Sequence, residues 1–106
     1  MNVRTQPKQA SVKRMLCNDV RRELRWGYKD QSVRNINEIL RKIERFAKSH
    51  QSVKAQRTSI ALAQYVNSLR RYRDKNLSLN DLKSVSIALL DLVRDWELSQ
   101  ETSARF

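Results

Sequence analysis

The fold is decided by residues 78–98, SLNDLKSVSIALLDLVRDWEL, the most apolar stretch of the chain and the only sizeable one with a net negative charge. Six of its apolar residues share one helical face: Leu82, Val85, Leu89, Leu92, Val93 and Trp96. This i, i+3, i+7 spacing is typical of a helix packed on a core. Ser78 is a good N-cap, and Asp81 suits the positive end of the helix dipole. The stretch therefore predicts an amphipathic helix that begins at Ser78.

The same segment carries a second, smaller apolar patch. Ile87 and Leu90 fall outside the main stripe, and Arg94 follows them in helical spacing. A helix with two apolar sides is either central in its domain or covered by another chain. Ile87, Leu90 and Arg94 are therefore the candidate protein interface.

Three further helices are expected upstream, at residues 11–26, at residues 32–48, and from residue 52 or 58 to residue 74. A Ser-Val pair followed by a basic residue recurs at Ser11, Ser32 and Ser52, and each serine can cap a helix. Gly27 and Asn76 are suitable residues for helix ends.

One glycine and one proline in 106 residues leave few helix breakers. We predict an all-α protein, a compact four-helix bundle with short loops. Residues 11–98 form its single domain, between flexible tails at residues 1–10 and 99–106.

The sequence argues against catalysis and against a membrane span. Cys17 is the only cysteine and His50, in a polar linker, the only histidine. No Gly-rich phosphate loop, CxxC or HExxH is present. We expect no catalytic residue, no metal and no cofactor, and hence no enzyme. Asp19 and Glu23 lie beside the apolar arc of their helix, where we expect interhelical salt bridges or partial exposure. Without an apolar run near 18 residues or a leader-like start, a soluble cytoplasmic protein is expected.

Charge is the strongest clue to function. Lysine and arginine number 22 against 11 acidic residues, which gives a net charge of +11, and 14 of the 22 are arginine. Residues 1–75 hold 19 basic and 6 acidic side chains, whereas residues 76–106 hold 3 and 5. From Arg45 to Arg73 there are seven basic residues and no acid. Arginine is a good phosphate ligand because its planar donor fork binds two oxygens at once.

We assign phosphate contacts to basic residues outside the apolar stripes: Arg34, Arg41, Arg45 and Lys48, then Arg70, Arg71 and Arg73, and also Arg21, Arg22 and Arg25. Glu38 flanks the second-helix set, where pairing with Arg34 and Lys42 is expected to neutralise part of the charge. Tyr72 lies among arginines, where it could stack on a base, although continuation of the core stripe from Leu69 explains it better.

Residues 60–68, IALAQYVNS, resemble the first helix and turn of a helix-turn-helix motif. The run that follows, as far as Tyr72, is too short for a turn and a recognition helix. One continuous helix is therefore expected through Leu69.

Two functions follow from these patterns. The preferred one is a small basic protein that binds DNA or RNA through phosphate contacts with little sequence preference. The alternative is a non-enzymatic protein-interaction module, a small subunit, adaptor or inhibitor of the kind that phages and plasmids encode. In that case Ile87 and Leu90 would contact a second copy or a larger protein.

Overall fold

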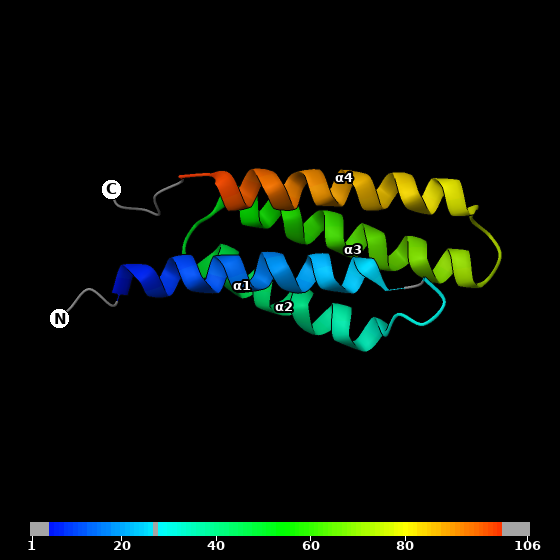
Figure 1. Cartoon of the computed structure of the whole chain (residues 1–106), viewed down its shortest axis with the longest axis horizontal. Helices are drawn as coiled ribbons and strands as arrows, with labels where there is room; N and C mark the ends of the chain where they lie inside the picture. The colour runs from blue at the N-terminus through cyan, green and yellow to red at the C-terminus, as the bar shows by residue number, and fades with distance from the viewer. Residues whose placement is uncertain (1–4, 27, 101–106) are drawn as a thin grey trace.

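The protein is an up-and-down bundle of four helices. The computed structural model describes residues 5–26 and 28–100. The helices are α1 (Thr5–Arg25), α2 (Val33–Ser49), α3 (Val53–Arg73) and α4 (Leu79–Leu98). Short connections make each helix antiparallel to the one before it (Figure 1). With no strand among the described residues, the predicted all-α four-helix bundle is confirmed.

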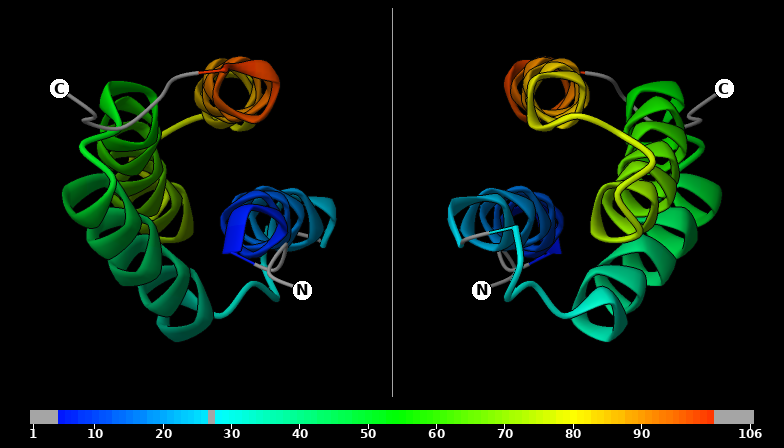
Figure 2. Two further views of the ribbon diagram at one scale, coloured as in Figure 1. Left: turned by 90° about the vertical axis from the view of Figure 1, so that its left-hand side faces the viewer. Right: turned by 90° about the vertical axis from the view of Figure 1, so that its right-hand side faces the viewer.

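The helices occupy the four corners of the bundle. α1 contacts α2 and α4, and α3 contacts the same two helices. Among the described residues, the backbones of α1 and α3 do not approach each other closely, and neither do those of α2 and α4. Seen along the bundle axis, α2 and α4 accordingly lie at opposite corners (Figure 2). The outer side of α2 therefore faces away from the acidic helix α4.

Serine side chains begin three of the four helices, as predicted. The hydroxyl oxygens of Ser32, Ser52 and Ser78 accept hydrogen bonds from the backbone N–H groups three residues later, at 3.3, 3.0 and 3.1 Å. These bonds satisfy N–H groups that have no partner within the helix.

The predicted start of the first helix at Ser11 is wrong, because α1 already begins at Thr5. Pro7 does not prevent this start, since a proline in the first helical turn removes an N–H that would lack an intrahelical partner anyway. The predicted helix stop at Gly27 and the tail residues 1–4 and 101–106 lie outside the described residues.

The end of α3 differs in detail from the prediction. Asp74 is the C-cap, and Lys75 takes the left-handed conformation at φ 64°. The N–H of Lys75 donates to the carbonyl oxygen of Tyr72 at 3.0 Å, and the N–H of Asn76 donates to that of Arg71 at 2.7 Å. This pair of bonds is a Schellman motif, in which Asn76 is the second residue after the cap rather than the cap.

The apolar stripes meet in one continuous core. On α4, Leu82, Leu89, Val93 and Trp96 are buried, and Val85 and Leu92 are half-buried against them. The stripe of α2 contributes Ile36, Ile39, Ile43 and Phe46. Trp96 packs edge-to-face on Phe46 with ring centroids 5.5 Å apart, which joins the C-terminal halves of these diagonal helices across the core. Within the described part of the chain, no helix is long and apolar enough to cross a membrane.

Candidate nucleic-acid interface

Four cations of α2 form an exposed line, which we call the basic face: Arg34, Arg41, Arg45 and Lys48. They lie opposite the buried stripe of α2, because residues 7, 4 and 3 positions apart return to nearly the same side of a helix. From Arg34 to Lys48 the helix rises about 21 Å. The basic face therefore spans most of the length of α2.

The exposed acid Glu38 lies on the same side of α2, but no member of the basic face is held in an ion pair of the described residues. The ion pairs of the described residues join Arg21 to Glu97, Arg22 to Asp19 and Lys54 to Asp95, and none includes a member of the basic face. The predicted pairing of Glu38 with Arg34 and Lys42 is not formed. Four guanidinium and ammonium groups are thus available to an external anion.

The helix next to α2 is also basic. α3, which packs beside α2, carries five basic residues and no acid. α4, at the opposite corner, carries four acids against two basic residues. Because α1 is also net basic, the bundle is electrically polarised along the diagonal from α2 to α4, and its field directs polyanions away from α4.

The three arginines predicted on α1 do not act as one group. Arg21 contacts α4, where its guanidinium donates to the Glu97 carboxylate at 2.5 Å. This hydrogen bond lowers the pKa of Glu97 and raises that of Arg21. Arg22 is bonded to Asp19 at 2.6 Å within the helix. Only Arg25 is both exposed and outside these ion pairs.

The arginines near the end of α3 also divide. Arg70 and Arg71 are exposed at the end of α3, which lies at the same end of the bundle as the start of α2, and the guanidinium of Arg71 donates to the carbonyl oxygen of Asn76 at 3.4 Å. Arg73 instead donates through Nη2 to the backbone carbonyls of Tyr28 and Gln31. It thereby fastens the α1–α2 turn to α3, a structural role that depends on residues more than 40 positions away in the chain.

The side chains around this turn form a buried polar network that the sequence analysis missed. Gln31 is buried; its amide nitrogen donates to the Glu23 carbonyl, and its amide oxygen accepts from the Tyr65 hydroxyl at 2.6 Å. Burial raises the pKa of Tyr65 to about 12. A glutamine inside a polar turn gives no periodic signal, so only the fold identifies this network.

Tyr72 is half-buried and packs edge-to-face on Tyr28, with ring centroids 6.2 Å apart. Its place beside the core agrees with the preferred explanation from the sequence. Asp19 and Glu23 are both partly exposed, as expected, but the Asp19 ion pair lies within α1 rather than between helices.

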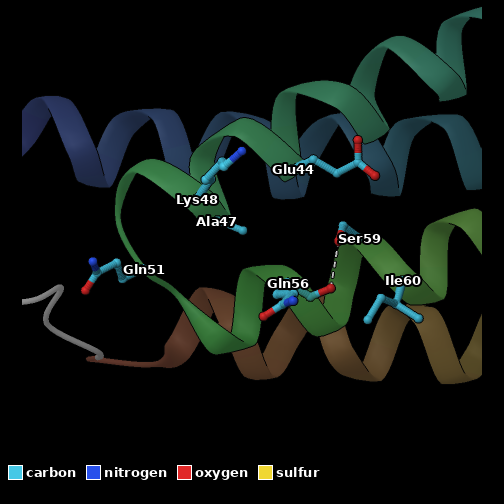
Figure 3. A pocket seen from close by; sticks show the side chains of 7 residues that line it. All are labelled: Glu44, Ala47, Lys48, Gln51, Gln56, Ser59 and Ile60. Carbon is cyan, nitrogen blue, oxygen red and sulfur yellow. Dashed lines mark hydrogen bonds between the residues drawn. The ribbon is translucent and has the colours of Figure 1, made fainter.

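Two hollows flank the basic face. The first, of about 510 Å³, lies between α2 and α3 and is lined by Glu44, Ala47, Lys48, Gln51, Gln56, Ser59 and Ile60 (Figure 3). Its Glu44 carboxylate would repel a phosphate, so we do not count this hollow as part of the phosphate-binding surface.

The second hollow, of about 530 Å³, lies on the α1 side of α2. Val12 and Phe46 supply its apolar surface, and Lys42, Arg45 and Lys48 add three cations. His50 completes the lining and stacks on Phe46 with ring centroids 4.1 Å apart. Unlike the first hollow, this one has no carboxylate among its described lining residues.

The predicted protein interface on α4 is only partly exposed. Ile87 is 60% exposed and Arg94 is exposed, whereas Leu90 is half-buried. Leu98, which is 68% exposed, falls about 20° from Ile87 on the helical wheel. The most exposed apolar residues of α4 are therefore Ile87 and Leu98 rather than Ile87 and Leu90, and Leu79 at the start of the helix is 39% exposed.

The single cysteine of the chain belongs to the core. Cys17 is buried, and its thiol lies 3.9 Å from the Val93 carbonyl oxygen. Burial raises the pKa of this thiol to about 12, which keeps it protonated and unreactive at neutral pH. Among residues 5–26 and 28–100, no three histidine, cysteine or acidic side chains gather as metal ligands would.

Comparisons of the chain with protein-family models, curated protein sequences and solved structures give no match.

Proposed function

We propose that this protein binds nucleic acid through the basic face of α2, by phosphate contacts with little dependence on base sequence. The observation that carries the proposal is the exposure of Arg34, Arg41, Arg45 and Lys48 on one side of one helix, outside every ion pair of the described chain. Exposed helix cations release the counterions of a phosphate backbone when they bind it. Arg70 and Arg71 of the neighbouring α3 extend the surface; Arg21 and Arg73 serve the fold.

A charge reversal with a matched control tests this proposal. The variant R41E/R45E changes the basic face, and K83E/R94E makes the same change in net charge on α4, at the opposite corner. All four side chains are exposed, so both variants are expected to fold. Loss of two phosphate contacts lowers affinity by roughly 25-fold for a single strand and 60-fold for a duplex in 0.1 M salt. We expect this loss in R41E/R45E only, measured by fluorescence anisotropy with a labelled oligonucleotide.

Equal losses in the two variants would show that net charge, not the basic face, determines binding. Unchanged affinity in R41E/R45E would refute the site. Circular dichroism of both variants confirms that the helices are intact.

A second candidate function rests on the outward apolar residues of α4. Ile87 and Leu98 are exposed beside Arg94, and such a face can pack against a second copy of the chain. If it does, I87D lowers the mass measured by sedimentation velocity to that of a monomer. I60D is the control, because Ile60 is similarly exposed, at 53%, but lies on α3. A wild-type protein that is monomeric at all concentrations would exclude this self-association.

A further inference from the structure

Trp26 is the most exposed aromatic side chain of the described residues. It follows the last residue of α1 and is 60% exposed, whereas the other tryptophan, Trp96, is 1% exposed in the core. Within residues 5–26 and 28–100, the indole of Trp26 takes part in no ring contact and no hydrogen bond. Exposing so large an apolar ring gives the fold no stability, and tryptophan is enriched in binding surfaces.

The position of Trp26 connects it to the basic face. α1 ends and α2 begins at the same end of the bundle (Figure 1), so Trp26 and Arg34 lie at that end. The C-terminus of α3, with Arg70 and Arg71, reaches this end as well. The exposed indole therefore lies at the end of the bundle that also carries exposed cations of three helices, and Arg25 precedes it in the chain.

An exposed aromatic ring among cations matches the chemistry of single-stranded nucleic acid. Unpaired bases stack on aromatic side chains while the backbone follows a positively charged surface. The bases inside a duplex are already stacked on each other and offer no free face. The hollow lined by Val12 and Phe46, at the other end of α2, also combines cations with an aromatic pair, because His50 stacks on Phe46.

We infer that Trp26 is a stacking platform for an unpaired base, and that the nucleic acid bound along α2 is therefore single-stranded. This inference rests on the proposed function. About 21 Å of basic face separates the Arg34 end from the Lys48 end, so a strand that contacts all of it comprises several nucleotides.

The test compares W26A, W26F and M15A by anisotropy, each with a labelled single strand and the corresponding duplex. Met15 is the control because it is an apolar residue 53% exposed on α1, the helix that Trp26 follows. Loss of one stacked base corresponds to roughly 5- to 150-fold weaker binding. We expect this loss for W26A with the single strand only, near wild-type affinity for W26F, and no effect of M15A. In the wild type, the single strand should also quench the emission of Trp26, a signal that is absent from W26F.

Three results would overturn the inference. W26A could bind the single strand as tightly as the wild type, or W26A could lose the same factor with the duplex. Alternatively, the emission of Trp26 could change with protein concentration and not with oligonucleotide, which would assign the ring to a contact between copies. If R41E/R45E still loses affinity in these cases, the basic face remains the binding surface and only the stacking role fails. If the wild type binds neither probe, the proposed function itself fails.

Discussion

Arg73 shows that an arginine at the exposed end of a helix can belong to the fold. It stands in the run Arg70-Arg71-Tyr72-Arg73, which predicts a phosphate clamp. Its guanidinium instead satisfies two backbone carbonyls of the α1–α2 turn. Arg21 is similar, because Glu97 of α4 engages it. Neither partner is near in sequence, so no local pattern separates these two arginines from those of the basic face.

Cys17 gives a prediction about pH. Its folded-state pKa is raised from 9.0 to about 12, first by burial and then by the charge of Glu97. The folded state therefore holds the thiol proton more tightly than the unfolded state, so the stabilisation is complete below pH 9 and declines as the pH rises toward 12. Between pH 9 and 10 the free energy of unfolding should fall by about 1 kcal/mol from this group alone.

Urea unfolding at pH 8, 9 and 10 checks this expectation. C17A is less stable overall, because it leaves a small cavity, but its stability should lack the decline that Cys17 causes between pH 9 and 10. The burial of Tyr65 adds a similar decline only above pH 10. Identical slopes for the wild type and C17A would contradict the assignment.

The ends of the helices follow local chemistry, and most were predictable. Ser32, Ser52 and Ser78 cap their helices as their neighbours in sequence suggest. The start of α1 differs from the prediction because Pro7, which is typical of irregular chain, is tolerated in the first turn of a helix. The arrangement of the helices was not predictable, because an apolar stripe shows that a helix is packed but not which helix covers it.

The left-handed residue after α3 yields a prediction about stability. Lys75 has φ 64°, a conformation that strains any residue with a Cβ and suits glycine. K75G should raise the free energy of unfolding by about 0.5 kcal/mol, since the relief of strain exceeds the added entropy of the unfolded chain. K83G is the control: it removes the same side chain inside α4 and should lower stability by about 1 kcal/mol. Thermal or urea unfolding that shows both variants destabilised would refute the strain at Lys75.

In the folded bundle the positive charge is unevenly distributed, because the acidic helix α4 lies diagonally opposite the basic face of α2. The sequence predicts that α2 has an exposed basic line and that residues 78–98 are mildly acidic. Only the bundle shows that these two helices occupy opposite corners. Trp26 is not identified by the sequence pattern, because it lies outside every apolar stripe. Only the fold shows that it lies at the same end of the bundle as Arg34.

The salt dependence of binding tests the role of the basic face most directly. Affinities for a single-stranded oligonucleotide, measured between 50 and 300 mM salt, should give a log-log slope of about −2.8 if four cations each contact one phosphate. R41E/R45E should reduce the magnitude of the slope by at least about 1.4, whereas K83E/R94E should leave it unchanged. Parallel lines for all three proteins would show that the phosphates are bound elsewhere, and the basic face of α2 would then not be the nucleic-acid site.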